Sequence, residues 1–174
     1  MYFSHHSDVV PKQYFPELLK EIEERVVDNA SERKSCLFYF HPLYLFNYPG
    51  LPSYEEYKVP NILNNIRTIV EKTTGQIFDY VLVHIYTSGK AKISWHFDTE
   101  ALNSPIASVS LGASRKFRLK EKGRKKGWDH EIVLNSGDLL VMNKGCQQKY
   151  LHCVPAELKV KEPRINLTFR QYEI

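Results

Sequence analysis

Apolar and polar positions recur with a helical period in two segments of the first half of the chain. Between residues 11 and 27, apolar side chains recur three or four positions apart while glutamate and lysine fill the other face, which is typical of an amphipathic helix. A second stripe of this kind predicts a helix over 61–73, and Gly75 suits its C-terminal end. The polar segment 28–35 predicts a loop.

After residue 76 the pattern changes to short apolar runs separated by glycine, asparagine and serine. Such runs predict β-strands, here at 81–86, 106–111, 116–120, 131–134, 139–142 and 164–172. The aromatic-rich segment 36–57 predicts short strands and loops whose rings lie mostly in the core. Helices followed by many short strands predict an α+β fold with a β-sandwich or barrel as its body.

Length and composition narrow the class of protein. The chain has 174 residues, which suffices for one domain with a substantial core. We see neither an apolar run long enough to cross a bilayer nor the start of a signal peptide, so we expect a cytosolic or nuclear protein that is not secreted. Cys36, Cys146 and Cys153 form no CxxC pair, which favours reduced thiols over a disulfide framework or a zinc ribbon. A net charge of +4 permits a polyanionic partner without requiring one.

The segment Trp95-His-Phe-Asp-Thr-Glu100 holds the first candidate site. On an extended backbone, residues two apart point to the same side, so His96 and Asp98 can reach one ion together. A downstream histidine completes a two-histidine, one-carboxylate set, the arrangement expected of non-haem ferrous oxygenases. His130 and His152 are both available, and we prefer His152 because a strand and a loop can return it to the site. By itself, HxD also fits an ordinary surface pair.

The C-terminal strand alternates strictly between polar and apolar residues. Arg164, Asn166, Thr168 and Arg170 share one side, and the apolar residues between them share the other. If the apolar side packs on helices, two arginines line the inside of a sheet, where guanidinium groups need anions. A dicarboxylic co-substrate would supply one carboxylate to each arginine. The alternative is an exposed edge strand with a solvated polar face.

Together these residues resemble a known family. His96-Phe-Asp98, then His152, then Arg164-x-Asn166-x-x-x-Arg170 resembles the AlkB family of ferrous, 2-oxoglutarate-dependent dioxygenases. The segments 106–117 and 137–142 agree with that pattern, so the match covers roughly residues 60–172. The resemblance implies a single dioxygenase domain over 1–174. Residues 1–58 would form an N-terminal helix and substrate-lid region, and residues 59–174 a helix plus a double-stranded β-helix (jelly-roll) core, with the N-terminal helices packed on one sheet.

The resemblance also implies the cofactors. His96, Asp98 and His152 would bind Fe(II), with 2-oxoglutarate and dioxygen as co-substrates.

For 2-oxoglutarate, the resemblance implies that Arg164 pairs with the distal carboxylate. Arg170 would lie near the other carboxylate and steady Asp98, while Asn166 and Tyr86 would add polar contacts. The chain has His84 where many members have asparagine; we expect histidine to donate a similar hydrogen bond.

The implied reaction is oxidative demethylation of N-alkylated bases in DNA or RNA, with release of formaldehyde, succinate and carbon dioxide. Such a base must leave a duplex or come from a single strand, so we expect a methylated, single-stranded nucleic acid as partner and a monomeric enzyme without membrane contact. Two alternatives remain open. The same cofactors can serve a protein or small-molecule substrate, or the chain can be a non-catalytic nucleic-acid-binding homologue.

Several residues are candidates for contact with that substrate. Aromatic rings can stack on a base, and the candidates are Trp95, Tyr44 and Tyr48. The Glu100 carboxylate can contact the edge of the base. A basic hairpin over 116–126 can hold phosphates through Arg118 and Lys125. Glu100 can equally be a surface acid, and the hairpin can be solvated without a partner.

Overall fold

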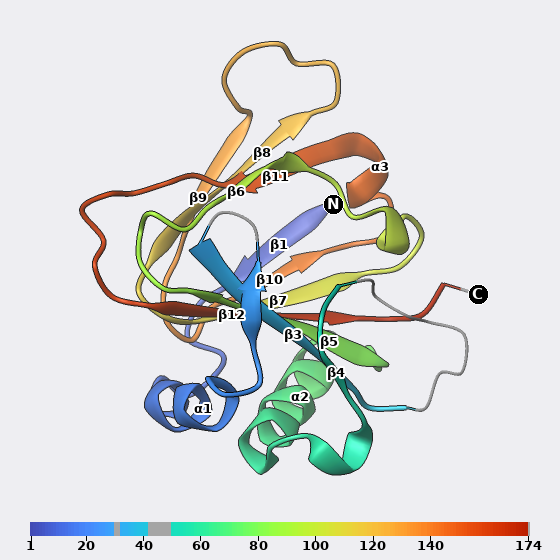
Figure 1. The fold of residues 1–174 in the computed structure, drawn as a ribbon. Coiled ribbons are helices and arrows are strands. Elements are labelled where there is room, and N and C mark those ends of the chain that lie inside the picture. Colours follow the sequence, from blue (N-terminus) through green and yellow to red (C-terminus); the bar gives the residue numbers. More distant parts are fainter. Residues whose placement is uncertain (30–31, 42–49, 174) are drawn as a thin grey trace.

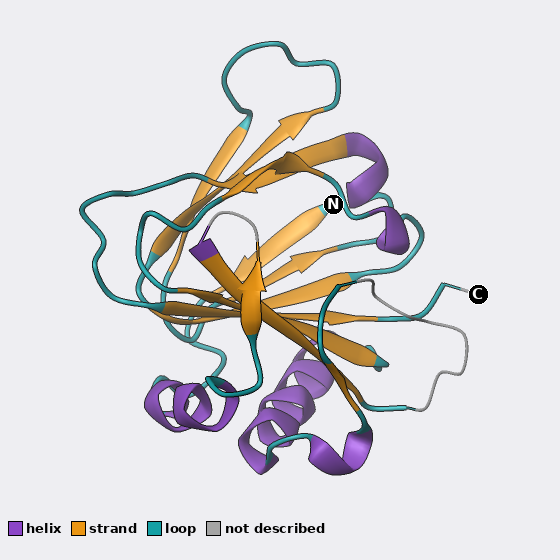
Figure 2. Cartoon of the chain, viewed as in Figure 1, coloured by secondary structure: helices purple, strands orange, loops and turns teal. Residues whose placement is uncertain are grey.

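The computed structural model describes residues 1–29, 32–41 and 50–173. Its strands form two sheets that face each other, and both longer helices lie against the outer side of the larger sheet (Figure 1; Figure 2 separates helices, strands and loops by colour). A hairpin of the smaller sheet ends in a long loop that projects away from the helices (Figure 1).

The larger sheet has eight strands. In spatial order they are β1 (Phe3–His6), β10 (Leu139–Met142), β7 (Ile106–Gly112), β12 (Arg164–Arg170), β5 (Tyr80–Tyr86), β3 (Arg33–Tyr39) and β2 (Val27–Asn29), with β4 (Ser53–Tyr54) beside β3. All neighbours pair antiparallel except β3 with β4. The strands predicted in the second half of the chain are confirmed, but the predicted loop over 28–35 is wrong, because Arg33 already begins β3.

The smaller sheet has four strands in the order β6 (Ile93–His96), β11 (Tyr150–Val154), β8 (Arg115–Glu121) and β9 (His130–Leu134). Short helical segments lie in connecting loops, among them η2 (Glu56–Lys58), η3 (Thr99–Ala101) and α3 (Cys146–Lys149). Two mostly antiparallel sheets packed face to face form the predicted jelly roll, with a cavity between them.

The helices are α1 (Tyr14–Ile22) and α2 (Asn61–Thr74). Helix α2 ends as predicted, because Gly75 adopts φ 68° and its N–H reaches the Glu71 carbonyl. Helix α1 is shorter than the predicted 11–27, since the chain already enters β2 at Val27. Among the described residues, no helix combines the length and apolar character needed to cross a membrane.

The helices bury the apolar side of β12. Ile165, Leu167 and Phe169 are fully buried and share one cluster with the apolar stripes of α1 and α2. This confirms the predicted direction of that face and leaves the polar side of β12 between the two sheets. Residues 1–58 contribute four strands to the larger sheet, so this segment is part of the sandwich as well as its cover; the division into domains stays a prediction.

One buried arginine ties two loops to the smaller sheet. The Arg115 guanidinium bonds to Glu157 Oε2 at 3.1 Å and to the carbonyl oxygens of Ser88, Ala91 and Pro155 at 3.2, 2.8 and 2.7 Å. Replacing Arg115 with methionine should lower the free energy of unfolding by about 3 kcal/mol, because these acceptors lose their donor in a buried place. Urea unfolding monitored by circular dichroism measures the change.

Arg118→Met is the matched control for that measurement. Arg118 lies on the same strand and pairs with Glu131 at 2.6 Å, but both side chains are partly exposed. Its loss should therefore cost no more than about 1 kcal/mol. Equal destabilisation by the two variants would contradict the role given to Arg115.

Candidate metal centre and its cavity

A cavity of about 160 Å³ lies between the two sheets. Its walls carry the three predicted metal ligands together with polar residues of β5 and β12. Phe117 and Met142 supply apolar parts of the lining. The cavity is therefore polar on the side of β12 and has room for a small organic molecule beside a metal ion.

The three predicted ligands converge in this cavity. One ligand atom each from His96, Asp98 and His152 lie within 4.8 Å of one another. The distances are 3.5 Å from His152 Nε2 to Asp98 Oδ2 and 3.9 Å from His96 Nε2 to Asp98 Oδ1. They meet because β6 and β11 pair antiparallel with His96 opposite His152. Two imidazoles and a carboxylate on one side of a site, with the other side open, suit Fe(II).

The protonation states also suit a metal. The His96 Nδ1 lies 2.7 Å from the Ser94 carbonyl oxygen, which can only accept, so Nδ1 carries the proton and Nε2 keeps its lone pair. Burial lowers the pKa of His152 to about 3. Burial alone would raise the pKa of Asp98, but the nearby Arg170 guanidinium and the two imidazoles lower it to about 2. At neutral pH the set is ready to bind a cation.

Arg170 and Gln147 hold Asp98 in place. Arg170 Nη2 lies 3.4 Å from Asp98 Oδ1, and its Nη1 donates to Glu100 Oε1 at 3.0 Å. The backbone N–H of Asp98 donates to the buried Gln147 Oε1 at 3.0 Å. The predicted contact between Arg170 and Asp98 is thus present, and Arg170 also fixes Glu100.

Arg164 offers an anion site. It is 1% exposed, and its Nη2 donates to Ser110 Oγ at 2.8 Å, while its Nε and Nη1 have no hydrogen-bond partner. In the neighbouring Arg115, equally buried, each of the three guanidinium nitrogens donates a hydrogen bond. Buried guanidinium N–H groups without acceptors are costly, and a carboxylate matches them bidentately. This site fits one end of a dicarboxylate such as 2-oxoglutarate.

Tyr86 and Asn166 line the cavity, and Arg164 lies next to Tyr86. Tyr86 pairs with Arg164 across β5 and β12, and the guanidinium carbon lies 5.0 Å from the Tyr86 ring centroid. Asn166 Nδ2 donates to Ser108 Oγ at 2.8 Å and to the Val109 carbonyl at 3.0 Å. Both residues line the expected co-substrate position, but the Asn166 N–H groups already stiffen the sheet; their contacts with 2-oxoglutarate stay predictions.

A hydrogen-bonded relay orients His84 on the same wall. Asn29 Nδ2 lies 3.3 Å from Ser35 Oγ, and Ser35 Oγ lies 2.5 Å from His84 Nδ1. Because Ser35 accepts from Asn29, its own hydrogen is available to His84 Nδ1, which places the imidazole proton on Nε2. Burial and the nearby Arg33 lower the pKa of His84 to about 3, so the ring is neutral. This supports the expectation that His84 donates one hydrogen bond in place of asparagine.

The relay leads to a prediction for Ser35. Ser35→Ala removes the group that fixes the His84 tautomer, so the affinity for 2-oxoglutarate should fall by about tenfold, as for other supporting residues behind a ligand-binding group. Calorimetry with Mn(II) in place of iron measures binding without turnover, and ¹⁵N shifts of the His84 ring report its tautomer. Ser53→Ala, at an exposed serine of β4, serves as control. An unchanged tautomer in Ser35→Ala would contradict the relay.

His84 also predicts how stability depends on pH. Its ordinary pKa is 6.5 and its folded pKa is about 3, so the unfolded chain binds a proton that the folded chain excludes. The contribution of neutral His84 to the free energy of unfolding is complete above pH 6.5. As the pH falls towards 3, the free energy of unfolding decreases by up to about 1.4 kcal/mol per pH unit. Urea unfolding of the metal-free protein at pH 7 and pH 5 measures this. His84→Gln should reduce the slope but not abolish it, because His152 behaves alike; an unchanged slope would refute the assignment.

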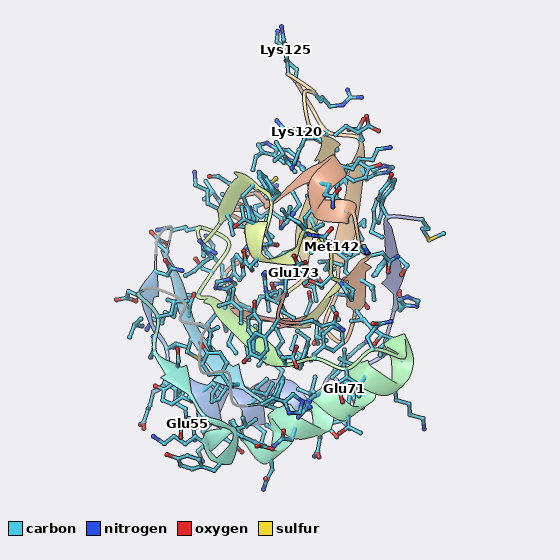
Figure 3. All side chains as sticks on the ribbon, turned by 90° about the vertical axis from the view of Figure 1, so that its right-hand side faces the viewer. Glu55, Glu71, Lys120, Lys125, Met142 and Glu173 are labelled. Atoms are coloured by element: carbon cyan, nitrogen blue, oxygen red, sulfur yellow. The ribbon has the colours of Figure 1, made fainter. Side chains whose placement is uncertain are left out.

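The residues predicted to touch the substrate are more dispersed. Trp95 lies on the outer side of β6, in a surface hollow, and not in the metal cavity. Trp95 does not line the metal cavity, because neighbours on a strand point to opposite sides and His96 points inward. Its contact with a substrate base stays a prediction. Arg118 lines the same outer hollow, and Lys125 lies at the hairpin tip, far from the cavity residue Met142 (Figure 3). Tyr44 and Tyr48 lie outside the described residues.

Four cavity-side residues escaped the sequence analysis, namely Asn29, Arg33, Ser35 and Gln147. Arg33 is 7% exposed, lines the cavity, and its Nε has no hydrogen-bond partner. The alternation of Arg33, Ser35 and Leu37 would have revealed an inward strand face, but the polar composition of 28–35 predicted a loop. Nothing local in the sequence points to Gln147.

Comparison with known proteins shows which family the chain resembles. Residues 4–170 match the model of the 2OG-Fe(II) oxygenase superfamily. The DNA oxidative demethylase ALKBH2 of Bos taurus is 41% identical over 119 residues, which is 63% of this chain and 43% of the relative. ALKBH2 of Mus musculus is 38% identical over 72% of this chain and 56% of its own length. The human alpha-ketoglutarate-dependent dioxygenase alkB homolog 3 is 35% identical over 63% of this chain and 42% of the relative.

Solved structures agree on the fold. The structure of OsALKBH1 superposes with a TM-score of 0.72 at 18% identity and covers 98% of both chains. A Pseudomonas putida prolyl-4-hydroxylase gives 0.57 at 15% identity, over 99% of this chain and 94% of its own. At these identities the likeness concerns the fold alone, and it confirms the jelly roll.

The chain belongs to the 2OG-Fe(II) oxygenase superfamily. Within it, the relatives named above confirm the resemblance to the AlkB family. The chain spans about half the length of these curated relatives.

Proposed function

We propose that this chain is an Fe(II)- and 2-oxoglutarate-dependent dioxygenase that oxidatively demethylates N-alkylated bases in DNA or RNA. One observation carries the cofactor part of this proposal. The cavity that holds the His96, Asp98 and His152 ligand atoms is flanked by a buried arginine, Arg164, whose Nε and Nη1 have no hydrogen-bond partner. A metal set in the cavity and a buried carboxylate receptor beside the lining residue Tyr86 suit a chelating dicarboxylate.

In this proposal the bound iron supplies the oxidation that couples 2-oxoglutarate, dioxygen and an N-methyl base to succinate, carbon dioxide, formaldehyde and the free base. The residues of the chain hold and orient the reactants. Arg164 takes the distal carboxylate, and Tyr86 and His84 direct polar groups to the co-substrate. Arg170 keeps Asp98 ionised and in place, while Phe117 and Met142 limit the water around the metal.

The substrate class rests on the relatives. The printed names of the ALKBH2 relatives describe them as DNA oxidative demethylases. In this chain Glu100 is held by Arg170, which also contacts Asp98. This arrangement supports the proposal that the Glu100 carboxylate contacts the substrate base. Arg33 adds a buried guanidinium to the cavity wall.

A nucleic-acid strand also needs phosphate contacts. The hairpin tip carries Arg124, Lys125 and Lys126, and Lys125 extends away from the body of the protein (Figure 3). Such a tip suits the phosphate backbone. We propose a single-stranded substrate, because a base in a single strand reaches the cavity without the loss of duplex pairing. Monomeric state and location in the cytosol or nucleus stay predictions.

A panel of single- and double-stranded DNA and RNA oligonucleotides, each with one N-methylated base, tests this function. The expected result is formaldehyde release together with a mass loss of one methylene unit, dependent on Fe(II) and 2-oxoglutarate. If 2-oxoglutarate turns over while no methylated oligonucleotide yields formaldehyde, the nucleic-acid substrate is wrong and the protein or small-molecule alternative takes its place. If 2-oxoglutarate neither binds nor turns over, the non-catalytic alternative holds.

A further inference from the structure

The outer side of the smaller sheet carries rings and cations in alternating rows. We call it the aromatic–basic face and define it by Trp95, Phe97, Arg118, Lys120, Lys122 and Trp128. It arises because β6 and β8 alternate: His96, Phe117 and Leu119 point inward, and the residues between them point outward. The face is therefore the back of the wall that holds the metal ligands.

Each ring of this face has its own cation. The Arg118 guanidinium carbon lies 3.7 Å from the Trp128 ring centroid, Lys120 Nζ lies 4.6 Å from that of Trp95, and Lys122 Nζ lies 3.4 Å from that of Phe97. Trp128 is 44% exposed. Tryptophan is enriched at binding interfaces, because its ring is largely apolar and also carries an N–H donor.

The charges of the face are only partly neutralised. Glu131 pairs with Arg118, but within the described ranges no carboxylate lies at salt-bridge distance from Lys120 or Lys122. The tip residues continue the positive charge at the same end of the molecule, and Figure 3 shows Lys120 and Lys125 there, opposite Glu55 and Glu71. The excess positive charge calls for an anionic partner.

The shape of the face narrows the chemistry of that partner. Trp95 and Trp128 line a hollow of about 400 Å³ together with Arg118, Cys153 and Pro155. An open hollow lined by two indole rings suits a flat ring that stacks on one of them, and the adjacent lysines can bind phosphates. An anionic chain that carries flat rings at regular intervals is a single-stranded nucleic acid, whereas an acidic peptide has the charge without the rings.

We infer that the aromatic–basic face is a second binding surface for single-stranded DNA or RNA, outside the metal cavity. A base stacks in the hollow between Trp95 and Trp128, and Lys120 and Lys122 contact the phosphates beside it. This rests on the proposed function, because it assumes a nucleic-acid substrate. The face starts at Phe97, between two metal ligands in the chain, so a strand bound there runs close to the site where its methylated base reacts.

The chain contains its own reporter for this surface. Its only two tryptophans, Trp95 and Trp128, both lie on the face. Titration of the full chain with an unmethylated, single-stranded 12-nucleotide DNA should quench tryptophan emission saturably, and an RNA of the same sequence should do likewise. Inorganic polyphosphate, which has the charge but no bases, should bind more weakly and quench far less.

Variants separate stacking from charge, with fluorescein-labelled oligonucleotide anisotropy as the readout. Trp128→Ala should weaken binding roughly tenfold through the lost stacking. The double variant Lys120→Gln, Lys122→Gln should reduce the slope of log affinity against log salt concentration by about 2, because two phosphate contacts are lost. Tyr57→Ala, at a ring 76% exposed on η2, and Lys72→Gln, on the exposed side of α2, are matched controls that should change neither.

Three results would overturn the inference: no quenching by DNA or RNA, equal quenching by polyphosphate, or face variants that bind like the controls. Because the oligonucleotide carries no methyl group, binding and turnover fail independently. Formaldehyde release with unaltered binding by the face variants refutes this surface alone. Loss of formaldehyde release on every methylated substrate, with quenching intact, refutes the proposed function and leaves the binding surface standing.

Discussion

Replacing Asp98 with alanine should abolish 2-oxoglutarate turnover and leave the fold intact. Asp98 contributes the one carboxylate of the ligand set, and its Oδ1 and Oδ2 lie 3.9 and 3.5 Å from the two histidine Nε2 atoms. Changes to residues that merely support a metal ligand cost about 10- to 100-fold, so loss of the ligand itself should exceed 100-fold. Succinate formation measured by mass spectrometry gives the rate, and circular dichroism checks the fold.

Asp129→Ala is the control, since Asp129 is a carboxylate of the hairpin that pairs with Arg124 away from the cavity. Its turnover of 2-oxoglutarate should match that of the parent. A rate in Asp98→Ala within a few-fold of the parent would refute the metal assignment. The removal of Asp98 also leaves Arg170 without one of its anions, but Glu100 still pairs with it, which is why we expect the fold to survive.

Arg164→Met should have opposite effects on binding and stability. Truncating a buried charged partner costs about 2 kcal/mol or more of binding, roughly a 30-fold weaker affinity for 2-oxoglutarate. The metal-free protein should melt at an equal or higher temperature, because methionine removes buried N–H groups that have no acceptor. Calorimetry with Mn(II) gives the affinity, and thermal unfolding gives the stability.

Arg115→Met is the contrasting variant, because Arg115 is equally buried but all three of its guanidinium nitrogens donate hydrogen bonds. It should lower the melting temperature. Should Arg164→Met bind 2-oxoglutarate as tightly as the parent, the unpaired guanidinium does not receive the carboxylate. Should it destabilise the protein as much as Arg115→Met, Arg164 has a structural role instead.

The strand and helix positions that carry the site were accessible from the sequence because they rest on local periodicity. The alternation of Arg164 to Arg170 predicted which side faces the cavity, and the buried stripe of Ile165, Leu167 and Phe169 confirms it. Whether His152 or His130 is the third ligand depends on contacts between residues far apart in the chain, which local periodicity does not give. His130 lies on β9 and packs at 5.0 Å against Phe3, whereas β11 places His152 opposite His96.

Two gaps in the sequence-based prediction have physical causes. Trp95 was named as a stacking candidate without a side of its strand, although the alternation that turns Phe97 away from the metal also turns Trp95 away. The polar segment before Cys36 was taken for a loop because a strand whose inward side lines a polar cavity lacks the apolar alternation that marks strands. Arg33 and Ser35 form such a polar inward side, so composition alone hid them.

The pairing of β6 has a consequence for what a bound ion would do to the protein. β6 is the outermost strand of its sheet, and its register with β11 is irregular, with paired positions at His96 and at Ile93 only. One metal ion held by His96 and His152 would join the two strands at one of those positions. The ion would cross-link the edge strand β6 to β11, and its removal would free β6 again. Metal binding would therefore complete the reactive centre and stiffen the sheet that carries it in the same step.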